Sequence, residues 1–307
     1  EMVEIATDAT RLDRGGEAFL TVRFQQAEAT ALVAAGHEIA WEQFALPQPA
    51  ARVAATPRQL EPLVVEEGAE SLRIVGRDLQ VVVARASGRI ETADWRGLRL
   101  IQSGPRLNLW RAATDNDGFK WRPDEPGKLL TRWLAAGLDR LVERLERLNL
   151  SRTEAGGVVV RVQSVSQADG VAAGFRHTST TTIHSDGVIA CECQLDGFGE
   201  VPPLPRIGLT LVLPAGFETL TWFGRGPGES YPDRKAGSPV GLYTGSVDAQ
   251  HVSYIMPQEN GNKTDVRWAT VTDAQGRGLK MSAASLMQVS AAHHTAFDFS
   301  AESRDRM

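Results

Sequence analysis

The sequence predicts an all-β protein built from antiparallel strands. Short segments of alternating apolar and polar residues recur along the chain, separated by Gly, Pro or Asp-Gly breaks. These segments do not alternate with helical ones, as they would in a parallel α/β barrel, and no apolar run approaches the about 20 residues of a membrane helix. A chain of 307 residues has room for one large β domain, or for a large and a small one.

The first 46 residues predict strands that cannot form a stable sheet by themselves. The strands are expected in EAFLTVRFQQ (17–26) and in HEIAWEQFALP (37–47), where Pro47 stops the second one. We interpret them as the end of a β-sandwich, and EMVEIATDATRL at the start as a cut into an existing strand of a longer protein. PQPAARVAATPRQLEP (47–62) has four prolines and no periodicity, which predicts a linker.

A larger β domain is predicted over residues 63–307. The segment 71–97 predicts two strands and a hairpin with Gly88 in the turn. Further strands are expected within 156–167, 174–195 and 206–224. The one helical pattern lies in KLLTRWLAAGLDRLVERLERLNL (128–150), where Gly137 is expected to end the helix and a strand to follow.

Composition and charge exclude several classes of function. The net charge of −5 gives no reason to bind nucleic acid or an anionic membrane. Cys191 and Cys193 are the two cysteines, and on a strand they share a face. Neither their spacing nor that of the histidines fits a zinc site, so we predict no metal site and interpret the thiols either as two small buried apolar side chains or as a surface pair in a reducing compartment.

The glycine-rich stretch TLTWFGRGPGESYPDRKAGS (219–238) is not a phosphate-binding loop. Such a loop needs a helix after its glycines, and Pro232 disfavours helical geometry at the residue before it. Glu229 and Asp233 would also repel a phosphate. The glycines and proline instead predict a rigid turn that carries polar side chains: Arg225, Glu229, Tyr231 and Asp233.

Two further stretches, RAATDNDG (111–118) and PQENGNKTDVRW (257–268), are rich in polar and turn-forming residues. The first carries Arg111, Asp115, Asn116 and Asp117, and the second carries Gln258, Glu259, Asn260 and Arg267. The first is not a calcium loop, because Phe119 and Pro126 occupy positions that need oxygen ligands. These polar groups, with one tyrosine, are of the types that recognise sugars. The same groups could instead lock two sheets together or dock the domain on another one, and we favour this structural interpretation.

Read together, PRLNLWRAATDNDGF (105–119), WFGRGPGESYPDRKAG (222–237) and YIMPQENGNKTDVRW (254–268) resemble the carboxyl-terminal domain, or small chain, of glycoside hydrolase family 2 bacterial β-galactosidases. LLTRWLAAGLDRL also matches the segment that follows the Asp-Asn-Asp motif in this family, and HEIAWEQFAL is similar to the end of its preceding immunoglobulin-like domain. The sequence departs from the family at Ala113, where Pro is usual, which is expected to loosen the turn. The match weakens after Met287.

The resemblance implies a large antiparallel supersandwich, similar to galactose mutarotase, after a partial immunoglobulin-like β-sandwich (1–46). It implies a parent enzyme, expected to be cytoplasmic and homo-oligomeric, that hydrolyses terminal β-galactosides with retention. Its catalytic glutamates lie in a TIM barrel that is not in this sequence, and its Mg and Na ions are held by other domains. The family's aromatic active-site wall residue lies beyond SAESRDRM, so the supersandwich is expected to be truncated.

We therefore expect a non-catalytic fragment that supports the barrel and walls the active site, with the other domains and the galactoside as partners. The alternatives are an aldose 1-epimerase, with His251 as acid and Glu229 or Glu259 as base, and a stand-alone carbohydrate-binding module. The resemblance assigns no catalytic residue to this chain. If the motifs form one polar cluster, six charged residues should converge: Arg111, Asp115, Asp117, Arg225, Glu229 and Arg267.

Overall fold

The computed structural model describes residues 16–46, 61–119, 122 and 124–299, and it confirms the predicted all-β, antiparallel class. The chain divides into two compact units, residues 1–58 and 59–307. The expected cut strand at the start and most of the expected linker fall on residues 1–15 and 47–60, which lie outside the described residues.

The first unit contains the two predicted strands as one antiparallel hairpin. β1 (Ala18–Gln25) pairs with β2 (Glu38–Leu46), with Ala18 opposite Leu46 and Gln25 opposite Glu38. Large apolar side chains stay exposed on it: Phe24, Ile39 and Phe44 are 61%, 62% and 51% exposed. The part of this unit that the structure describes is a single layer, so our interpretation of these strands as the end of a sandwich stays a prediction.

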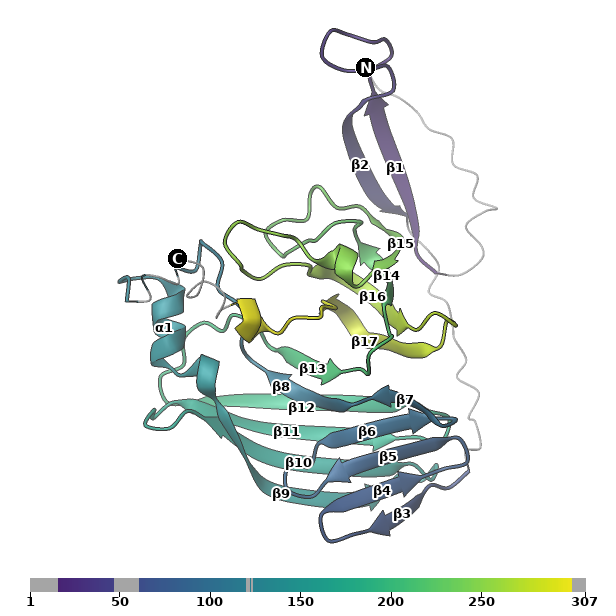
Figure 1. Ribbon diagram of the computed structural model, residues 1–307, viewed down its shortest axis with the longest axis vertical. Helices are drawn as coiled ribbons and strands as arrows, with labels where there is room; N and C mark the ends of the chain where they lie inside the picture. Colours follow the sequence, from purple (N-terminus) through teal and green to yellow (C-terminus); the bar gives the residue numbers. More distant parts are fainter. Residues whose placement is uncertain (1–15, 47–60, 120–121, 123, 300–307) are drawn as a thin grey trace. The chain divides into compact units, whose positions relative to one another are not determined.

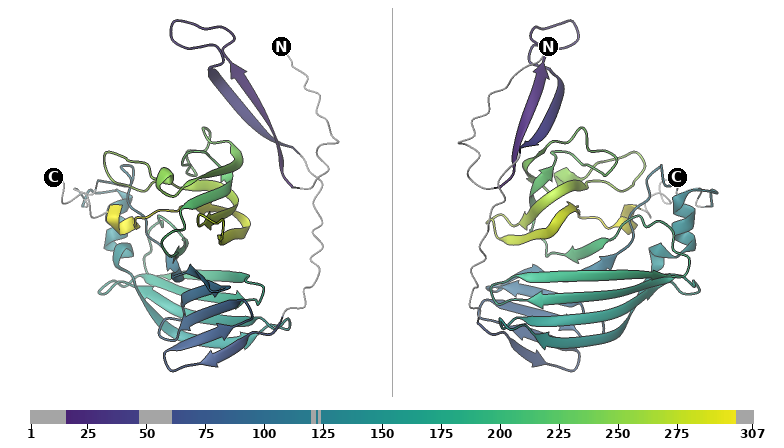
Figure 2. Two further views of the ribbon diagram at one scale, coloured as in Figure 1. Left: turned by 45° about the vertical axis from the view of Figure 1, so that its right-hand side comes forward. Right: turned by 180° about the vertical axis from the view of Figure 1, so that it is seen from behind.

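The second unit begins with a sandwich of two antiparallel sheets (Figure 1). The first sheet has the order β3-β4-β5-β6-β7, with strands Val64–Glu67, Ser71–Val75, Leu79–Ala84, Ile90–Trp95 and Leu98–Ile101. The second has the order β12-β11-β10-β9, and its strands are β9 (Val142–Arg152), β10 (Val158–Gln167), β11 (Gly174–Ile183) and β12 (Ile189–Phe198). Figure 2 shows the long strands of the second sheet across one side of this sandwich.

The two sheets enclose a common apolar core. Alternate residues of β5, such as Val81 and Val83, pack with alternate residues of β10, such as Val158 and Val160. The turn at Gly88 is as predicted, with φ 68°, and a Cβ there would lie 2.4 Å from a Val162 methyl group.

Segment 71–97 contains three strands, one more than the pair we predicted. The chain also turns after β4, where the Gly76 amide donates to the Leu79 carbonyl at 2.8 Å. A Cβ at Gly76 would lie 2.7 Å from Leu63, which is buried in the core. Leu63 directly precedes β3, whose Val64 lies opposite Val75, so this close approach is between neighbouring strands of one sheet and requires a residue without a side chain at 76.

A third sheet and a two-stranded ribbon complete the unit. The sheet has the order β15-β14-β16-β17, with strands Val240–Ser246, Thr219–Arg225, Lys263–Thr272 and Gly278–Val289. The ribbon pairs β8 (Ser103–Asn108) with β13 (Gly208–Val212), and Figure 1 shows it between the third sheet and the sandwich. Trp222 and Val266 lie in the core of the third sheet.

The predicted helix and the strand after it are both confirmed. α1 spans Leu129–Ala135, a short 3-10 turn (Leu138–Arg140) follows, and β9 begins at Val142. Gly137 ends the helix with φ 69°, and a Cβ there would lie 2.3 Å from Ala168. The helix buries Leu130 and Trp133 in a core that also contains Ala113.

Candidate functional site

The corner at 111–118 is closed by an ion pair. Arg111 donates two hydrogen bonds to the Asp117 carboxylate, at 2.6 and 3.0 Å, and the Thr114 amide and hydroxyl donate to it at 2.8 and 2.9 Å. Burial alone would raise the pKa of Asp117, but the hydrogen bonds from Arg111 and Thr114 hold this pKa below its usual value. The guanidinium also lies 5.1 Å from the centroid of the Trp133 ring. The carboxylate is therefore fully engaged within the protein.

The carboxylate of Glu229 joins the second predicted loop to the third. It accepts hydrogen bonds from Arg234, from the Tyr254 hydroxyl and, at 2.8 Å, from the Gly261 amide. Burial acts to raise the pKa of Glu229, but the donors outweigh it and lower this pKa. Tyr254 and Gly261 flank the PQEN sequence, so one carboxylate fixes both ends of that loop.

The same two loops are also joined by hydrogen bonds between small buried polar groups, which the sequence analysis did not identify. The hydroxyls of Ser230 and Thr264 lie 2.8 Å apart, and the Thr264 amide donates to Ser230 Oγ at 3.0 Å. Asn262 Nδ2 donates to the Ser230 carbonyl at 2.9 Å and to Gln288 Oε1 at 3.0 Å. Ser230, Asn262 and Thr264 are buried, so their hydrogen bonds replace those lost to water.

Charges of the other two motifs influence the pKa of Glu259, in the third motif. Glu259 is buried and pairs with Arg206, a residue outside the motifs that sequence reasoning did not identify. Burial raises the pKa of Glu259, and attraction to Arg206 and Arg111 offsets only part of this effect, while repulsion from Glu229 adds to it. The first, second and third motifs therefore interact electrostatically here.

A second polar group surrounds Asp265. Arg225 Nε donates to Asp265 Oδ2 at 2.5 Å, and Lys235 Nζ lies 2.7 Å from Oδ1. Arg225 also donates to the carbonyls of Lys235 and Ser238, at 3.2 and 3.0 Å, and Arg267 donates to the Asp265 carbonyl at 2.6 Å. Burial acts to raise the pKa of Asp265, but Lys235 and Arg225 lower it.

Five of the six residues for which we expected convergence divide between these two groups, and the sixth, Asp115, is exposed and joins neither. Arg111, which pairs with Asp117, and Glu229 both act on the charge of Glu259, whereas Arg225 and Arg267 contact Asp265. The groups are linked through residues 262–265, which bond to the glycine-rich loop on one side and to Arg225 on the other.

The other polar residues of the predicted set have lesser roles. Asp115, Asn116 and Asp233 are exposed, and the described part of the chain gives their side chains no hydrogen bond. Asn260 braces its own loop, because its Nδ2 donates to the Gln258 carbonyl at 3.0 Å and its Oδ1 accepts from the Val252 amide at 3.1 Å. The Gln258 side chain is half-buried.

Two buried groups beside this network have no charged hydrogen-bond partner among the residues that the structure describes. The Tyr231 hydroxyl is buried with no hydrogen-bond partner among the described residues, and burial together with nearby Glu259 and Glu229 raises its pKa. Lys263 is fully buried, with Nζ 5.0 Å from the centroid of the Trp222 ring. Burial lowers the pKa of Lys263 to about 8, although Glu229 acts in the opposite direction.

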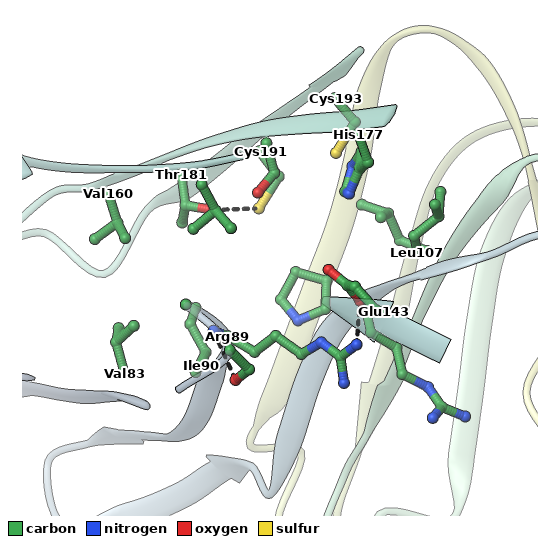
Figure 3. A pocket seen from close by; sticks show the side chains of 17 residues that line it. Val83, Arg89, Ile90, Leu107, Glu143, Val160, His177, Thr181, Cys191 and Cys193 are labelled. Carbon is green, nitrogen blue, oxygen red and sulfur yellow. Dashed lines mark hydrogen bonds and ion pairs between the residues drawn. The ribbon is translucent and has the colours of Figure 1, made fainter. Parts of the chain in front are cut away.

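A small cavity lies apart from this network, between the sheets of the sandwich. Figure 3 shows His177, Cys191 and Cys193 on one side of it and Arg89 on the other. Its volume of about 30 Å³ has room for about one or two water molecules. Arg89 pairs with Glu143, and burial lowers the pKa of His177.

The thiols and histidines form no site of their own within residues 16–46, 61–119, 122 and 124–299. Cys191 and Cys193 are free thiols that lie on one face of β12, as predicted. The ring of His251 packs against those of His294 and Phe299, and no described ion pair or hydrogen bond joins it to a glutamate. No three His, Cys, Asp or Glu side chains in these ranges are grouped to hold a metal ion.

The motifs thus form a polar network inside an all-β module, and its buried carboxylates are occupied by the module's own donors. Groups in this state hold loops and sheets together. Within the described residues, no helix is long and apolar enough to cross a membrane.

Two family models match this chain. The model described as β-galactosidase small chain matches residues 75–306, and the model described as β-galactosidase, domain 4, matches residues 1–47. The sequence is 34% identical to a β-galactosidase of Priestia megaterium over 289 residues, which cover 93% of this chain and 26% of that protein. It is 34% identical to a β-galactosidase of Vibrio cholerae over 235 residues, which cover 76% of this chain and 23% of that protein.

The chain therefore belongs to the β-galactosidase small-chain family, in agreement with the resemblance seen in its motifs. It spans about a quarter of the length of the curated relatives that it matches.

Proposed function

We propose that this chain is a non-catalytic, carboxyl-terminal part of a β-galactosidase. In this proposal it supports the barrel that carries the catalytic glutamates and helps to wall the active-site pocket. The observation that carries the proposal is the match to the P. megaterium β-galactosidase, which includes nearly all of this chain and about a quarter of the relative. The remaining three quarters of such a protein would supply the partner domains.

The state of the carboxylates supports a non-catalytic role. Retaining hydrolysis uses an acid and a nucleophile about 5 Å apart, with the substrate between them. Glu229 is held by three donors, Asp117 is engaged by Arg111 and Thr114, and Glu259 is buried against Arg206. The lining of the cavity in Figure 3 includes none of them. Each would have to break existing contacts before it could act on a sugar.

For the parent enzyme, we propose hydrolysis of terminal β-D-galactosides of the lactose type, with retention. Its Mg and Na ions would be held by other domains, and the parent would be a homo-oligomer. A cytoplasmic location agrees with the two free thiols, which persist in a reducing compartment. Direct contact of this module with carbohydrate would be confined to its exposed polar residues, such as Asp115, Asn116 and Asp233.

The test is hydrolysis of a chromogenic β-galactoside by the purified chain and by the complete parent enzyme. We expect turnover by the parent and none by the chain alone. Turnover by the chain that disappears in Glu229→Gln or Glu259→Gln would overturn the non-catalytic assignment. A mutarotation assay and a galactose titration of the same sample separate this function from an epimerase and from a free carbohydrate-binding module.

A further inference from the structure

The loop between residues 250 and 263 presents a fully exposed apolar side chain. Ile255 is 100% exposed and belongs to none of the three apolar cores. The six residues from 253 to 258, SYIMPQ, include no charged side chain. A single exposed apolar residue is ordinary on a protein surface. Whether the exposure of Ile255 indicates a binding site therefore depends on the conformation of its loop.

Hydrogen bonds hold this loop in place, independently of Ile255. At one end, Tyr254 donates to the carboxylate of Glu229, and at the other end the Gly261 amide donates to the same group at 2.8 Å. Asn260 adds two bonds: its Oδ1 accepts from the Val252 amide at 3.1 Å, and its Nδ2 donates to the Gln258 carbonyl at 3.0 Å. The loop therefore keeps Ile255 extended in water instead of letting it fold back onto the surface.

A rigid loop that displays one large apolar side chain has the properties of a binding anchor. Apolar anchors near the centre of an interface carry much of its affinity, and ordering them in advance reduces the entropy lost on association. Two exposed polar residues lie close to this loop. Arg234 donates a hydrogen bond to the Tyr254 hydroxyl, and Asp233 precedes Arg234 in the sequence. An apolar centre with a polar rim is the usual composition of an interface.

We propose that Ile255 is an anchor by which this module docks onto the rest of its parent β-galactosidase, entering an apolar hollow on the part of the parent that lies outside residues 1–307. The proposal rests on the proposed function, because that function supplies the partner. The relatives support this occupant, since about three quarters of their length lies outside the match. Glu229 would then position the anchor, because its carboxylate holds Tyr254 and the Gly261 amide on either side of Ile255.

The first test measures the accessibility of position 255. Ile255→Cys is made in the 307-residue chain and in the complete parent, and labelling by a maleimide is followed site by site with mass spectrometry. We expect the thiol introduced at position 255 to react at least ten times more slowly in the parent. Asp169→Cys is the control, because the Asp169 side chain is 81% exposed in a turn of the sandwich. Equal rates at position 255 in the two proteins, or equal protection at both positions, would overturn the proposal.

The second test measures stability. Because Ile255 contacts no core of the module, Ile255→Asp should leave the melting temperature of the 307-residue chain unchanged and lower that of the complete parent by several degrees. Ile255→Val should behave like the unaltered protein in both. An unchanged parent melting temperature in Ile255→Asp would rule the anchor out. Neither readout uses hydrolysis, so a parent that lacks β-galactosidase activity would refute the proposed function without deciding the docking.

Discussion

Replacement of Asp117 by Asn should destabilise the module strongly, because it leaves the Arg111 charge without its partner. Removing one member of a fully buried ion pair costs about 3–5 kcal/mol. The side chains of Arg111 and Asp117 are 20% and 7% exposed, so the remaining charge reaches water in part. We therefore expect a loss of about 2–3 kcal/mol in the free energy of unfolding, and a fall of about 5–10 °C in melting temperature for a domain of this size.

The matched control lies two residues away. Asp115 is exposed, and its side chain has no hydrogen bond in the described part of the chain, so Asp115→Asn should change the free energy of unfolding by less than about 0.5 kcal/mol. Both variants remove one negative charge, so a difference between them reports the ion pair and not the net charge. Thermal unfolding followed by circular dichroism measures it. Equal melting temperatures for the two variants would refute the reasoning.

The same pair predicts a pH dependence of known sign. The folded-state pKa of Asp117 is lowered below that of an unfolded chain, about 3.9. Its contribution is therefore complete above that value and is lost as pH falls through the folded-state pKa. The gap in melting temperature between the unaltered chain and Asp117→Asn should stay constant near neutral pH and close in acid. A gap that persists unchanged in strong acid would contradict this assignment.

Three further outcomes are expected. Arg225→Ala should cost about 2–3 kcal/mol in the free energy of unfolding, and Arg225→Lys less, because Arg225 bonds Asp265 and two carbonyls at once; chemical denaturation would show no change if these contacts are not formed. In the unaltered chain, Lys263 has a pKa of about 8 against 10.5 unfolded, so stability should rise by about 3 kcal/mol as pH rises between these values, and Lys263→Met should abolish that rise. Burial lowers the pKa of His177 in the folded chain, where it faces Glu143 and Arg89. The free energy of unfolding should therefore decrease as pH falls below about 6.5, and His177→Gln should not show this decrease.

Several features of the fold follow from the sequence because their causes are local. Strand alternation and turn residues predicted the strands β1 and β2 and the turn at Gly88, and glycine at 137 predicted the end of α1 and the strand after it. The break at Gly76 was not predicted, and the Leu63 side chain that packs against it comes from the segment that leads into β3. Local pattern indicates where strands run, but the place where a strand ends also depends on the neighbour that it packs against.

By itself, the sequence determined that this protein is an all-β member of the β-galactosidase small-chain family with three polar loops. Motifs and the alternation of a strand depend on neighbouring positions, so they can be recognised from the sequence alone. Only the tertiary structure decided the partners: Arg206 for Glu259, Asp265 for Arg225, and Trp222 for the buried Lys263. Spacing along the chain carries no information on these pairs, because each joins residues between 40 and 53 positions apart through the packing of sheets. Burial, which sets the cost of each charge and hence the need for a partner, likewise exists only once the strands have packed.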